Sequence, residues 1–567
     1  MSTAEQSIIE TIRQSYQNDV RPPTHAIGET IETMVAMRDG IRLRTMICRP
    51  AGDGPWPVLF VRTPYPMADL FRAHGEAYAQ RGFAYVVQFC RGTVGSEGIW
   101  KPNVNEPDDG IDSVNWLAGQ SWCRSIGMHG VSYMALTGWI IADQLPDKVK
   151  TLYLCHYGVD RYRSAYKDGL FRHDILTGWA MGNAGRPVTD DEHFAADYLK
   201  ACRHRPHITV DENLWGVKLD WYRDWITQTD EDSPYWQTGF WGKLKQIPEK
   251  IKVPVCIVAG WFDHHLEGTV LGYEKLNPQT KKMSRLIIGA WDHDFKPAIP
   301  GHQNKHAALN INADMFHWFD TILQDDRLPD PEIRTYVIGE DRWQSWDHWP
   351  IRRQAEKTLY LTACRHDNPA AYRLSSEKPD QTGAIEYQYD PDNPVYTNGG
   401  ETVFVSKAIR GSCLQNPPGD REDVISFISD VMTEDTLVTG RINIRLFVSS
   451  DCADTCFTAK IIDLMPDGKA YNIRSGLTTL AYRNGSRKRR SYQPGRIEEL
   501  NITLLPVTWS IRAGSRIRVD IASSNFPEYA IHSNQQGIWS IQETTKIANQ
   551  SVHIGGPYAA AIQLGLK

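Results

Sequence analysis

Three residue types that together can perform nucleophilic catalysis follow one another along this sequence. Ser132 lies in GMHGVSYMALTG, Asp263 in IVAGWFDHHLEG and His293 in IIGAWDHDF. A serine hydroxyl is a weak nucleophile at neutral pH unless a base takes its proton and a third group orients that base. Histidine can be the base and aspartate the orienting group. The three residues therefore point to acyl transfer through a covalent serine intermediate.

The residues around Ser132 fit a sharp turn between a strand and a helix. SIGMHG (125–130) is typical of a buried strand, and MALTGWIIADQL (134–145) is typical of a helix. Glycine suits such a turn because the backbone is strained and the helix packs closely on the strand. The strict pattern G-x-S-x-G is not met, because Met134 takes its last position. Alone, the serine could equally cap the helix, so the assignment depends on its partners.

The two partners each come directly after an apolar, strand-like run. Asp263 ends VPVCIVAGWFD (253–263), and His293 lies near the end of SRLIIGAWDHD (284–294). The carboxyl ends of neighbouring parallel strands share one edge of a sheet, where active sites form. The order Ser, Asp, His is also the order that this kind of turn requires. An aspartate that caps a helix and a histidine in a loop are simpler readings, but order and placement together favour a triad.

An acyl-transfer site also needs hydrogen-bond donors for the oxyanion. The backbone N–H of Tyr133 follows the serine directly, and this is one expected donor. Tyr65 ends the apolar run VRTPY and offers a phenolic O–H as the second donor. A buried tyrosine that packs under the sheet is the alternative for Tyr65.

A metal site is the competing interpretation of the histidine-rich run after Asp263. His264, His265 and Glu267 supply ligand types, but the run has no HExxH spacing, and adjacent histidines rarely share one ion. We therefore expect no metal and no cofactor.

The elements that must position these residues alternate between strand-like and helical segments. A hairpin is predicted at Asp39-Gly40, and PVLFVRTPY, AYVVQFC, SIGMHG and VKTLYLCHYG follow as short apolar runs. Helical segments such as ADLFRAHGEAYAQRG lie between several of them. This alternation predicts a doubly wound, mostly parallel sheet.

Two further regions break this alternation. Residues 159 to about 250 are helix-like, rich in Trp and Tyr, and too long for a crossover loop, which predicts an inserted helical cap. From about residue 330 the segments alternate apolar and polar residues between turns, as in an all-β sandwich or jelly roll. The predicted division is an α/β domain over 1–155 and 251–328, a cap over 156–250, and a β domain over 329–567.

Composition narrows the class of protein. The chain has 567 residues, a formal net charge of −6 and a pI near 6.3, which argues against a nucleic-acid partner. No run approaches a membrane span, and the N-terminus lacks the pattern of a secretory signal. Ile8, Ile9 and Ile12 suggest a short amphipathic arm that packs on its own chain or on a partner subunit. Ten cysteines without a CxxC pair indicate free thiols in a reducing compartment, so we expect a cytoplasmic protein.

Specific motifs spread through most of the chain resemble one enzyme family. They include RTPY (62–65), GVSY (130–133), GWFD (260–263), GAWDH (289–293) and LFVSSDCADTCFTAKIIDLMPDG (446–468). The sequence resembles the family of cocaine esterases, X-Pro dipeptidyl peptidases and α-amino acid ester hydrolases. The resemblance implies an α/β-hydrolase with an inserted helical cap and a C-terminal all-β jelly-roll domain.

The same resemblance implies roles for individual residues. Ser132 would be the nucleophile, Asp263 the triad acid and His293 the base, with the Tyr65 hydroxyl and the Tyr133 N–H as oxyanion donors. In the cap, Trp179 of ILTGWAMGN matches a tryptophan that lines the acyl pocket of the family.

Some positions depart from the family pattern. Ala135 replaces the last glycine of its serine motif, G-x-S-Y-x-G. His265 and Leu266 stand where α-amino acid ester hydrolases place acidic residues that hold the substrate ammonium. A free α-amino acid ester is therefore disfavoured, and His265 suggests contact with a polar, neutral or anionic acyl group.

The leading hypothesis is a serine hydrolase that cleaves a carboxylic ester or amide of a small molecule. An X-Pro-type aminopeptidase, and an acyltransferase or cyclase that uses the same acyl-enzyme, are alternatives within catalysis. A non-catalytic binding protein on this fold is the alternative of another class. A homodimer is suggested only by the habit of the family and by the N-terminal arm.

Overall fold

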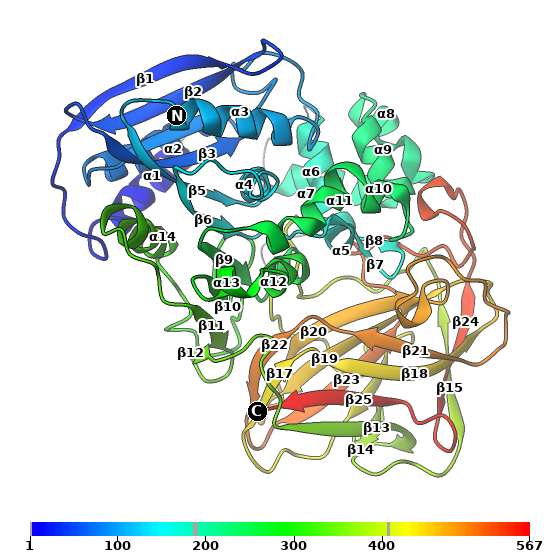
Figure 1. Cartoon of the computed structure of the whole chain (residues 1–567). Coiled ribbons are helices and arrows are strands. Elements are labelled where there is room, and N and C mark those ends of the chain that lie inside the picture. The colour runs from blue at the N-terminus through cyan, green and yellow to red at the C-terminus, as the bar shows by residue number, and fades with distance from the viewer. Residues whose placement is uncertain (1–2, 185–190, 405–408) are drawn as a thin grey trace.

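The computed structural model describes residues 3–184, 191–404 and 409–567. Two large sheets organise these residues, one of ten strands and one of thirteen. Figure 1 shows the first sheet with its helices in the upper part of the molecule, a group of short helices beside it, and the second sheet below.

The ten-stranded sheet is parallel through its centre. β3, β4, β5, β6, β9, β10 and β11 pair in parallel, whereas the hairpin of β1 and β2 and the edge strand β12 are antiparallel. Its order is β1 (Ile27–Ala36), β2 (Arg42–Pro50), β4 (Ala84–Phe89), β3 (Trp56–Thr63), β5 (Cys123–Val131), β6 (Val149–Cys155), β9 (Val255–Gly260), β10 (Arg285–Gly289), β11 (Glu332–Val337) and β12 (Arg342–Trp346).

Alternate residues of the central strands face opposite layers of helices. In β3, Val58 and Phe60 join one hydrophobic cluster, and Leu59 and Val61 join another. The first cluster includes residues of α3 (Glu106–Ala118), α4 (Tyr133–Trp139) and α12 (Leu266–Glu274). The second includes residues of α1 (Thr3–Ser15), α2 (Ala68–Ala79) and α14 (Ile311–Phe319). Because the strands are buried on both faces, they appear in the sequence as continuous apolar runs.

The N-terminal arm packs on its own chain. Ile9 and Ile12 of α1 are buried in the cluster that also holds Phe71 of α2, whereas Ile8 is about half exposed. The apolar stripe of this helix is therefore used within the monomer.

A set of short helices lies between β6 and β9, where the sequence predicts a cap. Tryptophans and tyrosines from several of them fill one cluster with the sheet. The helices are α5 (Arg161–Ala165), α6 (His173–Asn183), α7 (Asp191–Arg203), α8 (Val210–Trp215), α9 (Asp220–Thr227), α10 (Pro234–Gln237) and α11 (Gly239–Gln246), with a two-stranded ribbon of β7 (Tyr166–Lys167) and β8 (Leu170–Phe171).

The second sheet is formed by strands that follow residue 350. These strands are β13 (Ala355–Arg365), β14 (Ala371–Ser375), β15 (Gly383–Tyr389), β16 (Ile425–Ile428), β17 (Thr436–Gly440), β18 (Asn443–Ser450), β19 (Cys456–Leu464), β20 (Ala470–Thr479), β21 (Glu498–Thr503), β22 (Val507–Ile511), β23 (Arg516–Ala522), β24 (Ala548–Ile554) and β25 (Ala561–Leu566). The first sheet extends past the boundary expected at 328/329, because β11 pairs in parallel with β10 and β12 pairs with β11.

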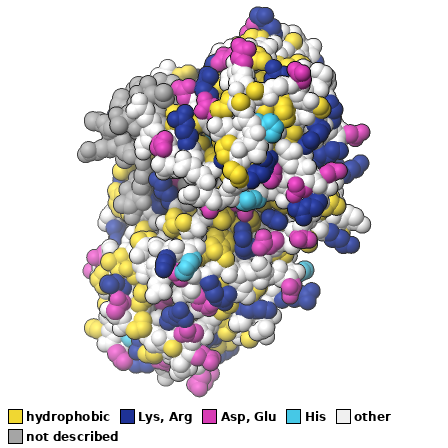
Figure 2. All heavy atoms as spheres, turned by 90° about the vertical axis from the view of Figure 1, so that its left-hand side faces the viewer, with side chains coloured by type: hydrophobic (Ala, Val, Ile, Leu, Met, Phe, Trp, Pro, Cys, Tyr) yellow, Lys and Arg dark blue, Asp and Glu magenta, His cyan; other side chains and the backbone are white. Residues whose placement is uncertain are grey.

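The described residues show the mixed surface charge and the free cysteines that the composition indicates. Figure 2 shows basic and acidic side chains interspersed over one face of the molecule. None of the described helices has the length and apolar character that a membrane crossing requires. All ten cysteines are free, and all of them except Cys364 are buried.

Candidate active site

Ser132 occupies a strained turn between β5 and α4. Its backbone has φ 58° and ψ −129°, a conformation that residues other than glycine seldom adopt. Its N–H donates to the carbonyl oxygen of Cys155 at 3.0 Å, which ties the turn to the end of β6. A Cβ atom on Gly130 would lie 2.3 Å from the backbone carbonyl of Met134, so only glycine allows this approach of helix to strand. Strain of this kind at a single hydroxyl residue is typical of a nucleophile.

Asp263 and His293 lie in the loops after β9 and β10 and are joined by a hydrogen bond. Nδ1 of His293 contacts Oδ2 of Asp263. The other carboxylate oxygen, Oδ1, accepts the backbone N–H of His265 at 2.8 Å. Asp263 is fully buried, whereas the side chain of His293 is 13% exposed. Asp263 is thus enclosed and held, whereas part of the His293 ring remains accessible.

The charges around this pair favour an ionised acid and a basic imidazole. Burial alone would raise the pKa of Asp263, but three neighbouring imidazoles, above all that of His293, hold it well below its usual range. Burial alone would lower the pKa of His293, but the Asp263 carboxylate outweighs this effect, so the pKa of His293 is raised. An aspartate that remains charged beside a histidine stabilises the protonated imidazole that forms during acyl transfer.

Ser132 connects to this pair through His156, a residue that sequence reasoning missed. His156 follows Cys155, whose carbonyl binds the Ser132 N–H, and its own Nδ1 lies 3.0 Å from the carbonyl oxygen of His293. Among the described residues, the Ser132 hydroxyl forms no hydrogen bond to the His293 ring. In free enzymes this catalytic contact is often long and tightens when substrate binds.

Tyr65 lies in the loop after β3, and Trp179 of α6 reaches it from the cap. The indole Nε1 of Trp179 donates to the Tyr65 hydroxyl at 3.3 Å. Burial raises the pKa of Tyr65 to about 12, so the hydroxyl stays protonated at neutral pH and can donate a hydrogen bond. Trp179 also stacks on the Tyr133 ring, with 5.9 Å between ring centroids and 12° between the planes. Trp179 therefore contacts both of the other aromatic residues predicted for the site, Tyr65 and Tyr133.

A buried polar network fixes Tyr133 beneath this group. The Tyr133 hydroxyl donates to Glu106 at 2.5 Å and accepts the backbone N–H of Asn103 at 2.9 Å. Burial raises the pKa of Glu106, and the positive charge of Arg62 and the bond from Tyr133 oppose that rise. The sequence contains Glu106 in NEPDDG, but nothing in that run shows that it meets Tyr133.

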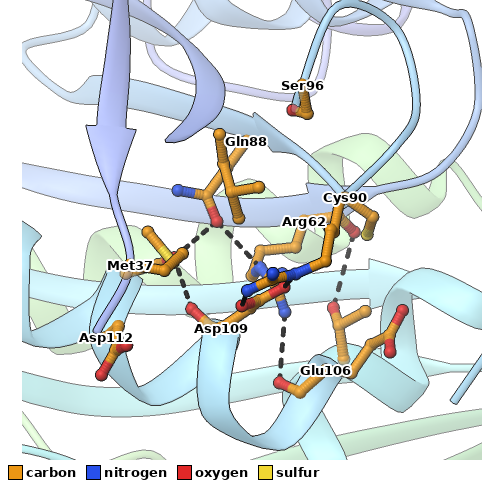
Figure 3. Close-up of polar contacts among 12 residues, drawn as sticks. Met37, Arg62, Gln88, Cys90, Ser96, Glu106, Asp109 and Asp112 are labelled. Atoms are coloured by element: carbon orange, nitrogen blue, oxygen red, sulfur yellow. Dashed lines mark hydrogen bonds and ion pairs between the residues drawn. The ribbon is translucent and has the colours of Figure 1, made fainter. Parts of the chain in front are cut away.

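Arg62 is the centre of the same network. Figure 3 shows its guanidinium lying among Gln88, Asp109 and the backbone of Glu106. Its Nε donates to the Gln88 side chain at 2.9 Å, its Nη1 donates to the Glu106 carbonyl at 3.2 Å, and Asp109 lies 3.8 Å from its Nη2. The arginine side chain is fully buried. Because Arg62 precedes the Tyr65 loop and Glu106 holds Tyr133, one network supports both expected oxyanion donors.

His265 is buried and has partners of its own. Its Nδ1 lies 2.9 Å from the Ser164 hydroxyl of α5, and its ring packs on Tyr157 at 4.5 Å between centroids. Glu267, which the metal interpretation requires, instead pairs with Arg163 at 2.8 Å and with Arg441 at 3.3 Å.

The described residues that could bind one metal ion are a different group. His156, Asp263 and His293 have ligand atoms within 4.8 Å of one another. The Nδ1 atoms of both histidines already have hydrogen-bond partners in the carbonyl of His293 and in Asp263. This arrangement favours an acid–base role for the group.

Two arginines of the β domain hold the loops that carry Asp263 and His293. Nη1 of Arg474 in β20 donates to the Trp261 carbonyl at 2.5 Å and pairs with Glu401 at 2.7 Å. Arg410 lies 2.7 Å from Asp294 and 3.2 Å from Asp292, on either side of His293. The geometry of the site therefore depends on both parts of the chain.

Two family models match this chain in succession. Residues 39–294 match the X-Pro dipeptidyl-peptidase (S15 family) model, and residues 328–563 match the X-Pro dipeptidyl-peptidase C-terminal non-catalytic domain. The chain is 29% identical to a cocaine esterase of Rhodococcus over 563 residues, which cover 94% of this chain and 97% of the relative.

Solved structures share the fold along the whole chain. An aminopeptidase of a marine sediment archaeon (Thaumarchaeota archaeon) aligns with a TM-score of 0.81 at 22% identity, covering 97% of this chain and 98% of the other. An α-amino acid ester hydrolase aligns with a TM-score of 0.78 at 21% identity, with the same coverage. The predicted fold class, an α/β-hydrolase with a mostly parallel sheet and a C-terminal all-β domain, is confirmed.

Proposed function

Because the chain belongs to the family of cocaine esterases, X-Pro dipeptidyl peptidases and α-amino acid ester hydrolases, we propose that it is a serine hydrolase of small carboxylic esters. In this proposal the nucleophile is Ser132, the base His293 and the acid Asp263. The observation that carries it is the Asp263–His293 hydrogen bond at the ends of adjacent strands, beside a strained serine.

The first half of the reaction forms an acyl-enzyme. His293 takes the proton of the Ser132 hydroxyl while the oxygen attacks the ester carbonyl, and the negative charge moves to the carbonyl oxygen. The Tyr65 hydroxyl and the Tyr133 N–H donate to this oxyanion, each contributing about 3 kcal/mol. As the tetrahedral intermediate collapses, the bond to the alcohol breaks and His293 gives its proton to the leaving oxygen.

The second half releases the acid. Water takes the place of the alcohol, loses a proton to His293 and attacks the acyl-enzyme, and the proton returns to Ser132 as the carboxylic acid leaves. Asp263 holds the imidazole in one tautomer through both halves, a role supported by its burial and its two hydrogen bonds. Trp179 contributes an aromatic wall near the acyl group, supported by its bond to Tyr65.

Prolyl peptidase activity is the second candidate, because the model matched by residues 39–294 describes X-Pro dipeptidyl peptidases. One assay separates the candidates: wild type and Ser132→Ala are compared on p-nitrophenyl esters and on prolyl p-nitroanilides. Ester turnover that disappears in the variant supports the esterase, and turnover of the anilides alone supports the peptidase. Turnover that survives in Ser132→Ala contradicts both.

We also propose a cytoplasmic location for the protein and assembly as a homodimer. Free, mostly buried thiols suit a reducing compartment, which supports a cytoplasmic location. A homodimer rests on the family resemblance alone, since the amphipathic stripe of α1 is buried within the monomer. Light scattering coupled to size-exclusion chromatography measures the mass directly.

A further inference from the structure

Arg161, the first residue of α5, is a buried cation without an anionic partner. Its exposed fraction is 7%, and its Nε atom has no hydrogen-bond partner. No carboxylate of the described residues lies within ion-pair distance of it, whereas Arg163 of the same helix contacts both Asp160 and Glu267. Burying an unpaired charge is costly, so an arginine kept in this state calls for a reason.

Two tryptophans of the cap hold the guanidinium in place. Its Cζ lies 4.5 Å from the centroid of the Trp225 ring and 5.8 Å from that of Trp241. Contact with aromatic rings offsets part of the cost of removing the guanidinium from water, but it occupies only the face of the group and does not satisfy its N–H donors. A guanidinium carries its N–H groups in one plane as a fork, which is the geometry that binds a carboxylate with two parallel hydrogen bonds.

The same tryptophans connect Arg161 to the proposed oxyanion site. The Trp225 ring lies 5.9 Å from that of Trp179, whose indole donates to Tyr65. Burial raises the pKa of Tyr65, and the charge of Arg161 is among the effects that oppose this rise. Burial lowers the pKa of His265, and the charge of Arg161 lowers it further. Arg161 is therefore close enough for its charge to act on both residues.

Tyr157 is a third polar residue beside Arg161 and His265. Burial raises its pKa, while the charge of Arg161 and a hydrogen bond from it act in the opposite direction. Tyr157 also packs on His265. A phenol is a neutral partner, so the positive charge of Arg161 remains without a counter-ion.

We propose that Arg161 binds a free carboxylate on the acyl part of the substrate, so that the enzyme prefers monoesters of dicarboxylic acids. This inference rests on the proposed esterase function. Trp179, expected beside the acyl group, contacts both Tyr65 and Trp225, and Trp225 in turn contacts Arg161, so we place the carboxylate at the end of the acyl chain remote from the ester.

The test compares charged and neutral esters of matched shape. Mono-p-nitrophenyl glutarate and adipate carry the free carboxylate, and their methyl p-nitrophenyl diesters do not. We expect wild type to have a kcat/KM for the better monoester at least about tenfold above that of its diester, as hydrogen bonds to a charged group predict. In Arg161→Met this ratio should fall to one or below, mainly through a higher KM for the monoester. Arg161→Lys should retain part of the preference.

Two controls keep the test decisive. Arg163→Met removes a paired arginine from the same helix and should leave the ratio at the wild-type value. The rate of labelling by a fluorophosphonate reports a folded, reactive serine in each variant. A wild type that hydrolyses both esters equally, or a ratio that survives Arg161→Met, overturns the inference and leaves the esterase intact. A wild type that cleaves neither ester and is not labelled overturns the proposed function itself.

Discussion

In the proposed mechanism His293 both accepts and returns a proton, and the neighbouring Asp263 carboxylate sets its pKa. Because the carboxylate outweighs burial, the pKa of His293 lies above its ordinary value, and the neutral form that acts as base is lost as the pH falls. We expect the acidic limb of kcat/KM to lie above about pH 6.5, the usual value for histidine.

Asp263→Asn tests this reasoning. Removal of the carboxylate leaves burial as the main effect on His293, so its pKa should fall below the ordinary range and the acidic limb should move to lower pH. The rate should drop by about 10⁴, because the tautomer is no longer fixed. A pH–rate profile of both proteins measures the shift, and an unmoved limb would show that another group titrates.

Tyr65 and Tyr133 are expected to serve the oxyanion through different atoms. Tyr65→Phe removes the donor itself and should lower kcat by about 10²–10³ with little change in thermal stability. Measurement of kcat and of the melting temperature on one preparation tests this prediction. A kcat near that of wild type would show that the Tyr65 hydroxyl does not serve the oxyanion.

Tyr133→Phe is the matched variant, because it keeps the backbone N–H and deletes only the hydroxyl. Glu106 and the Asn103 N–H then lose a buried partner, so unfolding should become easier by about 1–3 kcal/mol while kcat changes far less than in Tyr65→Phe. Denaturant titration gives the free energy, and a large loss of kcat at unchanged stability would contradict the assignment.

For single residues, the sequence predicts the positions of those side chains that directly follow strands. Ser132, Asp263 and His293 stand after apolar runs, so their place on one sheet edge follows from the pattern. Glu106 and Arg161 could not be found in this way, because their significance depends on non-local contacts with Tyr133 and with Trp225. A strand-end histidine such as His156 is a signal that the same reasoning could have used.

At the scale of elements, the turn between β5 and α4 determines whether the serine is presented. Gly130→Ala would bring a Cβ atom to 2.3 Å from the Met134 carbonyl and push the helix away from the strand. We expect a loss of about 1–3 kcal/mol in unfolding free energy and a marked loss of activity.

Gly182→Ala is the control for that substitution. Gly182 lies in α6, and no atom of the described residues lies near the position of a new Cβ, so alanine there should be neutral or stabilising. Chemical denaturation and ester turnover of both variants test the pair. Equal effects at the two glycines would mean that close packing at the turn is unimportant.

The parallel strands were predictable because burial on both faces leaves continuous apolar runs, as in β9 and β10. The position at which the first sheet ends along the chain could not be predicted in the same way. β11 alternates between partly buried and buried residues at its start, which resembles the β domain in sequence, although it pairs with β10. Such a boundary is set by the pairing of strands that are distant in sequence. The pattern of apolar and polar residues within one strand does not show which strand it pairs with.

At the scale of the whole molecule, the β domain holds the loops that carry Asp263 and His293. Arg474→Met would leave the buried Glu401 carboxyl group without its ion-pair partner and release the Trp261 carbonyl, two residues before Asp263. We expect about 3–5 kcal/mol of destabilisation, and a loss of kcat even at temperatures where the variant is folded.

Arg512→Met, which removes an exposed ion pair with Asp435 in the same domain, should leave both stability and kcat close to those of wild type, because exposed ion pairs contribute little. Calorimetry and single-substrate kinetics on the two variants make the comparison. Wild-type kcat in folded Arg474→Met would show that the acid loop holds its geometry without the β domain.

The proposal that Ser132 is the nucleophile is tested most directly by mass spectrometry of the protein after treatment with a fluorophosphonate. We expect one adduct, on the peptide that contains Ser132, formed slowly in Asp263→Asn and not at all in Ser132→Ala. An adduct on another residue, or an unlabelled wild type that still hydrolyses esters, would contradict it.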